Sequence, residues 1–104
     1  MTNDKVLSLL GLAKKAGKLK SGEYCVEEEL KKNRARLVIV AGDASKNTSK
    51  KYEDMCNFRH VPIVFYAEKD SLGKCIGCEE RAAVVITDDG FSNGIMREIS
   101  KQNT

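Results

Sequence analysis

One short run of apolar residues is the centre of the hydrophobic pattern. Residues 37–41 read LVIVA without a polar interruption, and the run stops at Gly42 and Asp43. A largely β-branched run of this length, with no solvent-facing positions, is typical of a strand that helices cover on both faces. We therefore expect a central strand here, with a ligand site near its carboxyl end around Gly42.

Two amphipathic helices are predicted before this strand, with a very short strand over 18–20 between them. The first helix is capped by Asn3 or Asp4 and ends near Ala16, and Gly17 supplies the left-handed residue after it. Its apolar residues form two neighbouring stripes: Val6, Leu10 and Ala13, then Leu9, Leu12 and Ala16. The second helix opens at Ser21 and Gly22 and directs Val26 and Leu30 inward, while Cys25 also takes an inward-facing position. Its three consecutive acids, Glu27, Glu28 and Glu29, are interpreted as a solvated face with partners among Lys31, Lys32 and Arg34.

Helices and strands keep alternating after the central strand. A third helix, capped by Asp43, Ser45 or Asn47, buries Thr48, Tyr52, Met55 and Cys56. The next predicted elements are a turn over 57–60, a strand over 61–67, a short helix over 72–77, a loop over 78–81 and a strand over 82–87. A final helix begins at Asp88 or Asp89, and its Phe91, Ile95 and Ile99 side chains point inward. This order predicts one domain over 1–104, an α/β protein of the three-layer α/β/α sandwich type with a small mixed sheet of about four strands.

Charge and composition narrow the classes of function. The net charge is +3, but residues 1–36 carry nine Lys/Arg against five Asp/Glu, and the rest carry nine against ten. A basic excess in the first third is compatible with a phosphate-rich partner or with an ordinary soluble surface. No signal peptide or membrane span is recognisable, so we expect a cytoplasmic protein with no membrane partner, in which the four cysteines are reduced thiols. Separately, we expect a monomer.

The sequence gives little indication of catalysis. Cys75 and Cys78 form a C-x-x-C pair, which allows a thiol redox hypothesis, but the pair follows a helix instead of opening one. A zinc site would need two more ligands from Cys25, Cys56 and His60, and His60 is better interpreted as a turn residue before Pro62. Glycine patterns of nucleotide-binding loops are absent. We expect no enzyme activity, cofactor, metal or small-molecule substrate.

A basic turn offers the remaining candidate chemistry. Lys18, Lys20 and Gly22 lead into a helix N-terminus, where Gly22 would let a nucleic-acid backbone approach the first helical N–H groups. The loop over 78–82 precedes the later strand. An ordinary capped loop is the alternative interpretation of this turn.

Five strings in register identify a family resemblance. They are LLGLAKKAGKLKSGE, ARLVIVAGDAS followed by NT, VPIVF, LGKCIG and AAVVITDDGF, and they extend from about Leu9 to Phe91. Together they resemble the bacterial YlxQ-type proteins of the L7Ae family of kink-turn-binding ribosomal proteins. The resemblance implies a compact α/β/α sandwich that binds sharply bent, structured RNA without catalysing a reaction, in association with the ribosome.

The same resemblance implies an RNA-facing edge. The family motif Gly-x-Asn-Glu-x-x-Lys begins at Gly22, but Tyr24, Cys25 and Glu28 replace its other three defining residues, while Lys32 keeps a later basic position. We expect Tyr24 to stack on an unpaired base. The expected RNA-binding residues are Lys18, Lys20, Gly22, Tyr24, Lys32, Lys74, Arg81 and Ala82. The alternative function is a protein-interaction module that kept this fold and lost the kink-turn surface.

Overall fold

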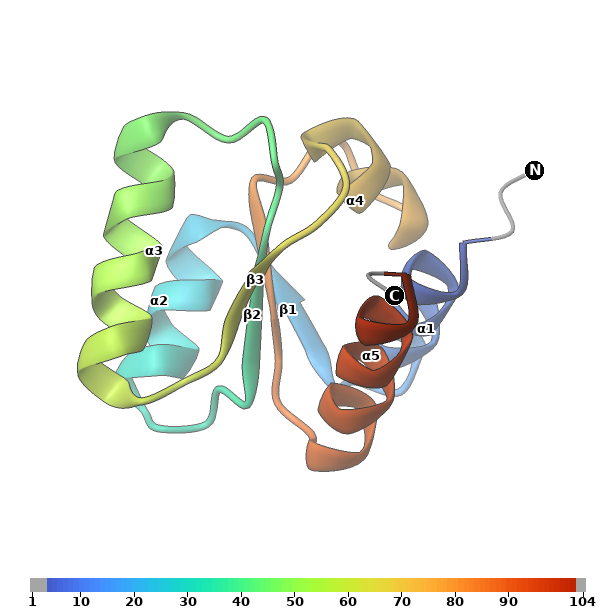
Figure 1. Ribbon diagram of the computed structural model, residues 1–104, viewed down its shortest axis with the longest axis horizontal. Helices are drawn as coiled ribbons and strands as arrows, with labels where there is room; N and C mark the ends of the chain where they lie inside the picture. The colour runs from blue at the N-terminus through green and yellow to red at the C-terminus, as the bar shows by residue number, and fades with distance from the viewer. Residues whose placement is uncertain (1–3, 103–104) are drawn as a thin grey trace.

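The elements alternate between helix and strand along most of the chain (Figure 1). The computed structural model describes residues 4–102. Its elements are α1 (Lys5–Lys15), β1 (Leu19–Ser21), α2 (Glu23–Lys31), β2 (Leu37–Val40), α3 (Lys46–Arg59), β3 (Ile63–Phe65), α4 (Lys69–Cys75), β4 (Ala83–Ile86) and α5 (Asp89–Gln102).

The sheet has the strand order β1-β4-β2-β3, so β2 and β4 are the interior strands. All four residues of β2 are buried, which confirms the prediction of a central strand. β2 pairs with β3 in parallel, with Val38 opposite Ile63, and with β4 antiparallel, with Val40 opposite Ala83. β1 also pairs antiparallel with β4. The predicted small mixed sheet in an α/β fold is thereby confirmed.

Helices cover both faces of this sheet. Figure 1 shows α2 and α3 on one side and α1, α4 and α5 on the other. Alternate residues of β2 serve the two layers, because successive side chains of a strand point to opposite faces. Leu37 and Ile39 pack with α1, and Val38 and Val40 pack beside Tyr52 of α3. The uninterrupted apolar run of β2 is therefore the sequence signature of a strand with two buried faces.

The strand directions place four chain segments at one edge of the sheet. β1, β2 and β3 run in the same direction and β4 runs against them. The carboxyl ends of the first three strands therefore meet the start of β4. We call this side the carboxyl edge and define it by Ser21, Gly22, Ala41, Arg81 and Ala82. The opposite side, with Lys18, Arg36 and Thr87, is the amino edge.

The first helix is capped as the sequence predicts. The Asp4 side chain accepts a hydrogen bond from the Leu7 N–H at 3.1 Å, whereas Asn3, the other candidate cap, lies outside the described residues. Gly17 has φ of +76°, in agreement with its predicted left-handed role. The second apolar stripe is only partly buried, because Leu12 keeps 54% of its surface exposed.

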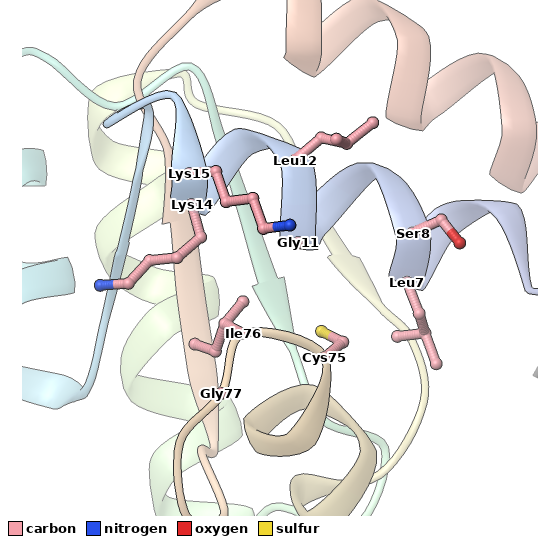
Figure 2. A pocket seen from close by; sticks show the side chains of 9 residues that line it. All are labelled: Leu7, Ser8, Gly11, Leu12, Lys14, Lys15, Cys75, Ile76 and Gly77. Carbon is pink, nitrogen blue, oxygen red and sulfur yellow. The ribbon is translucent and has the colours of Figure 1, made fainter. Parts of the chain in front are cut away.

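A glycine sets the distance between α1 and α4. A Cβ atom built on Gly11 would lie 2.9 Å from the Cys75 carbonyl oxygen, so the end of α4 packs directly on the α1 backbone (Figure 2). Leu72, at the centre of α4, is fully buried in the core that this contact closes.

Several predicted boundaries differ from the structure. The strand expected over 61–67 is confined to Ile63–Phe65, because Ala67 turns the chain with φ of +60°. α4 begins earlier than predicted, at Lys69, because its N–H donates to the Asp43 side chain at 2.8 Å. α5 begins as predicted, since the Asp88 carboxylate accepts from the Phe91 N–H at 2.9 Å. No helix in the described range 4–102 is long and apolar enough to cross a membrane.

Candidate nucleic-acid interface

Two segments about sixty residues apart meet at the carboxyl edge. The Gly22 N–H donates to the Ala83 carbonyl oxygen at 3.2 Å, and Nε of Arg81 donates to the Ser21 hydroxyl at 3.2 Å. The entry to α2 and the loop before β4 therefore form one continuous surface. The antiparallel pairing of β1 with β4 brings about this contact, because the end of one strand lies beside the start of the other.

A shallow groove of about 340 Å³ runs over this surface. It is lined by Ser21, Gly22, Glu23, Thr48, Glu80, Arg81 and Ala82. Three of these, Gly22, Arg81 and Ala82, are among the residues expected from the sequence. The sequence pattern placed Thr48 in the buried stripe of α3, but it lies in the first turn, where the side chain hydrogen-bonds the capping Ser45 hydroxyl at 3.0 Å. A residue so close to the start of a helix faces the loops at the sheet edge. The position of Thr48 near the predicted start of the third helix could therefore have indicated from the sequence that it belongs to this surface.

Gly22 is the N-cap of α2 and has φ of +93° and ψ of 152°. Apart from its two chain neighbours, no heavy atom of residues 4–102 lies within 4 Å of the Cβ position that another residue would have there. The glycine is therefore required by the backbone conformation, and the space beside it is open to a partner. No side chain caps α2, so N–H groups of its first turn remain available to an acceptor such as a phosphate oxygen.

The Arg81 side chain holds the loop before β4 in place. Besides its bond to Ser21, its Nη1 donates to the carbonyl oxygens of Glu79 at 3.3 Å and Glu80 at 3.0 Å. The Arg81 backbone N–H also donates to the Lys69 carbonyl at 3.0 Å, which ties the loop to α4. Nη2 is the part of the guanidinium that forms no hydrogen bond within 4–102. Arg81 thus shapes the surface and has one nitrogen left for an anion.

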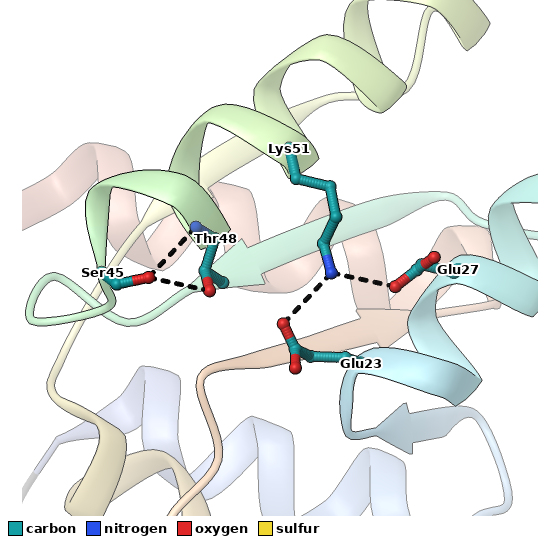
Figure 3. A network of polar contacts seen from close by, with 5 residues as sticks. All are labelled: Glu23, Glu27, Ser45, Thr48 and Lys51. Carbon is teal, nitrogen blue, oxygen red and sulfur yellow. Dashed lines mark hydrogen bonds and ion pairs between the residues drawn. The ribbon is translucent and has the colours of Figure 1, made fainter.

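The local charge is mixed rather than strongly basic. Lys51 of α3 bridges two acids of α2, with Nζ 3.1 Å from Glu23 and 3.0 Å from Glu27 (Figure 3). The Glu27 hydrogen bond, helped by Glu23 and opposed by burial, raises the pKa of Lys51 above its ordinary value. Glu79 and Glu80 are exposed on the opposing loop. A phosphate is repelled by these carboxylates, so contacts through backbone and uncharged side chains are favoured here.

The remaining expected RNA-binding residues lie at different distances from this groove. Tyr24 is 76% exposed in the first turn of α2, next to Gly22, and Lys20 is exposed on β1. Lys18 lies at the amino edge, where its carbonyl accepts from the Thr87 N–H at 3.0 Å. Lys32 caps the far end of α2, about 15 Å along the helix axis from Gly22, and pairs with Glu28 at 3.8 Å.

Lys74 projects from α4. Its ammonium pairs with Asp70 at 3.1 Å, and both side chains are well exposed. The structure thus brings Gly22, Arg81 and Ala82 together in the groove, with Tyr24 next to Gly22 in the first turn of α2. Lys20 acts electrostatically on Glu29, toward the far end of α2, and Lys18, Lys32 and Lys74 do not line the groove.

The cysteines of the described region give no support to a redox or metal site. Cys25 is exposed, so the predicted inward-facing position is wrong: the buried stripe of α2 is Val26, Glu29 and Leu30. Cys56 is buried, as predicted. Burial raises the pKa of the Cys75 thiol to about 11, the opposite of what a nucleophilic thiol needs. Among residues 4–102 no group of three or more His, Cys, Asp or Glu side chains is placed to hold a metal ion.

Comparisons with known proteins agree on one family and one fold. Residues 4–96 match the family model described as the ribosomal protein L7Ae/L30e/S12e/Gadd45 family. The chain is 46% identical over 88 residues to the "RNA-binding protein YlxQ" of Bacillus subtilis (strain 168), covering 85% of this chain and 88% of that protein.

Solved structures give the same picture. A protein of unknown function from Bacillus halodurans superposes with a TM-score of 0.90 at 36% identity, covering 94% of this chain and 99% of that one. The Giardia lamblia 15.5kD RNA binding protein superposes with a TM-score of 0.76 at 22% identity, covering 97% and 90%. This second likeness shows the fold alone.

Proposed function

The chain belongs to the ribosomal protein L7Ae/L30e/S12e/Gadd45 family, and we propose that it is a non-catalytic RNA-binding protein of the cytoplasm that recognises a kink-turn or a similarly bent structured RNA. We propose further that it acts as a monomer in association with the ribosome. The RNA would lie against the carboxyl edge, over the groove between Gly22 and Arg81. Family membership supports RNA as the ligand, because the B. subtilis relative is named an RNA-binding protein.

One structural observation carries the choice of this edge. The hydrogen bonds Gly22 to Ala83 and Arg81 to Ser21 join the two segments that the family resemblance implicates in RNA binding. Because folded RNA is recognised through its backbone shape and its unpaired bases, a surface built from both segments would offer the RNA more contacts than either segment alone.

The mixed charge of the edge indicates recognition by shape and stacking. The open space beside Gly22 admits an RNA backbone, and the exposed ring of Tyr24 lies next to it as a platform for an unpaired base. Nη2 of Arg81 is available for a phosphate. Lys20 and Lys74 would add peripheral phosphate contacts, while Lys18 and Lys32 would contribute only to the general positive field.

A binding titration tests this proposal. The purified protein is titrated into a labelled kink-turn RNA and a straight duplex of equal length, in a gel-shift or filter-binding assay at several salt concentrations. We expect tighter binding to the kink-turn RNA that persists at about 0.15 M salt. Equal and weak binding to both RNAs, abolished by salt, would defeat the kink-turn proposal.

Variants of an exposed aromatic residue locate the binding edge. Tyr24→Ala removes the stacking ring and should weaken kink-turn binding by about 1–3 kcal/mol, whereas Tyr24→Phe should retain most of the affinity. Phe58→Ala is a matched control, because Phe58 is 79% exposed near the end of α3, away from the groove.

A protein-interaction module is the second candidate. The bridged Glu23 and Glu27 and the exposed Glu79 and Glu80 favour it, since they make the edge less attractive to phosphate. It predicts that charge reversal at Lys20 and Lys32 leaves the association with RNA in cells unchanged. A large drop in recovered RNA would count against it.

A further inference from the structure

A second groove lies between α1 and the end of α4, on the layer opposite α2 and α3 (Figure 2). Its volume is about 570 Å³, and it shares no lining residue with the groove at Gly22 and Arg81. Leu7 and Leu12 come from α1, and Cys75 and Ile76 from the end of α4. Leu12 is 54% exposed and lies about 200° around the helix from the fully buried Leu10.

Two glycines line this groove. Gly11 lets the end of α4 approach the α1 backbone closely, because a Cβ there would lie 2.9 Å from the Cys75 carbonyl oxygen. Gly77 forms part of the opposite wall with φ of +73°, and a Cβ on it would meet nothing within 4 Å. Apolar side chains of α1 and of the end of α4 therefore border the groove, with Leu7 and Leu12 pointing to different sides of α1 (Figure 2).

The charge at one end of the groove is positive. Lys14 and Lys15 occupy the last turn of α1 and line the groove together with Leu12 (Figure 2). Both are exposed, and neither forms an ion pair with the acidic residues described by the structure. A ligand complementary to the groove therefore has an apolar face that ends in carboxylates.

We propose that this groove binds an acidic amphipathic helix of a partner protein. Leucine-like side chains of that helix would pack against Leu7, Leu12 and Ile76, the arrangement by which amphipathic helices fill apolar grooves. Carboxylates in its first turn would meet Lys14 and Lys15, where they also suit the positive end of the helix dipole. RNA is the poorer occupant, because unpaired bases stack on aromatic rings or guanidinium planes and the residues lining this groove include neither.

A titration with a defined probe tests the proposal. The probe is a synthetic helical peptide with leucines spaced three and four residues apart and glutamates in its first turn. A matched peptide carries lysines in place of the glutamates. The full protein, labelled with ¹⁵N, is titrated with each peptide by NMR. We expect amide shifts at Gly11, Leu12 and Gly77, and tighter binding of the glutamate peptide.

Variants of residues that line the groove test whether the peptide binds there. Leu12→Asp should weaken binding of the glutamate peptide by about tenfold, because it places a carboxylate in the apolar contact. The double variant Lys14→Glu with Lys15→Glu should reverse the preference to the lysine peptide. Phe58→Asp and the pair Lys31→Glu with Lys46→Glu are controls of matched chemistry at exposed positions outside the groove, and they should leave binding unchanged.

Three results would overturn the proposal. They are the absence of amide shifts in the groove at millimolar peptide, shifts confined to the Gly22 and Arg81 surface, and displacement of the peptide by kink-turn RNA. The last result would assign the groove to RNA. Because the peptide titration contains no RNA until this final step, its failure does not bear on the RNA-binding proposal.

Discussion

Glu29 lies on the buried side of α2, where the Arg34 guanidinium holds its carboxylate through hydrogen bonds of 3.1 and 2.7 Å. The residue is only 6% exposed, whereas Arg34 reaches into solvent. The hydrogen bonds from Arg34 hold the pKa of Glu29 below its usual value of 4.5, and burial opposes them. This single pair fastens the end of α2 to the turn before β2.

The Glu29 pair should make stability depend on acid pH. Because the pKa of the carboxyl is lower in the folded than in the unfolded state, its stabilisation is present above the unfolded pKa and is lost as pH falls through the folded pKa. Glu29→Gln should therefore lower the urea midpoint at pH 7 and flatten its decline below about pH 5. The control is Glu53→Gln, because Glu53 is an exposed carboxyl without an ion pair in residues 4–102. This variant should show the same decline of the urea midpoint with falling pH as the wild type. Identical slopes for wild type and Glu29→Gln would contradict this role.

Gly73 is the second residue on which local geometry depends. It is buried in α4, and a Cβ atom there would collide with the backbone of Glu79 and lie 2.8 Å from the Cα of Glu80. Gly73→Ala should destabilise the protein by about 1–3 kcal/mol, because the loop before β4 must move. Gly94→Ala, in α5 with nothing within 4 Å of the new Cβ, should be neutral or stabilising. Urea unfolding of both variants checks this, and equal effects would show that the crowding is relieved without cost.

At the scale of the elements, the cap of α1 also contacts a residue far away in the sequence. Asp4 accepts from the Leu7 N–H and also, at 2.7 Å, from the Tyr66 hydroxyl, so one carboxylate fixes the start of α1 and joins it to the chain after β3. This anchor sets the position of α1 against α4, and with it the groove that contains Leu12. The capping oxygen and the tyrosine contact have separable effects.

Asp4→Ala should lower stability by about 0.5–2 kcal/mol through loss of the cap. Asp4→Asn keeps an oxygen that can accept a hydrogen bond from the Leu7 N–H, so it should lose less stability than Asp4→Ala. Hydrogen exchange of the first-turn amides of α1, together with thermal unfolding, distinguishes the two effects. Equal exchange in Asp4→Ala and wild type would mean that other groups start the helix.

At the scale of the whole molecule, the two edges of the sheet are well separated in space. Lys18 lies at the amino edge, about 13 Å from Gly22 along β1. That separation exceeds the screening length of about 8 Å at physiological salt, so a charge at Lys18 influences the carboxyl edge only weakly.

This geometry predicts unequal effects of two changes on RNA affinity. Arg81→Ala should weaken kink-turn binding by about tenfold or more at 0.15 M salt, because it removes both a phosphate contact and the support of the loop. Lys18→Glu should change affinity less than about threefold there, and more at low salt. Filter binding at two salt concentrations measures this, with circular dichroism to verify folding. A larger effect of Lys18→Glu than of Arg81→Ala would place the RNA at the amino edge.

The sequence by itself determined the order and type of the elements and the two-sided burial of β2. These features follow from local rules that act within a few residues of the chain. The rules are the spacing of apolar residues, the capping of helices by side chains such as Asp4 and Asp88, and the positive φ of residues such as Gly17. The family strings added the fold and the two segments of the proposed RNA edge.

Only the tertiary structure decided which faces meet. The pairing of β1 with β4 joins Gly22 to Arg81, and the packing of α2 buries Glu29 while leaving Cys25 exposed. The trough beside Leu12 likewise depends on where α4 crosses α1. The physical reason is that a periodic pattern states which side of an element is apolar, whereas the neighbour that covers it is chosen by long-range packing and strand direction.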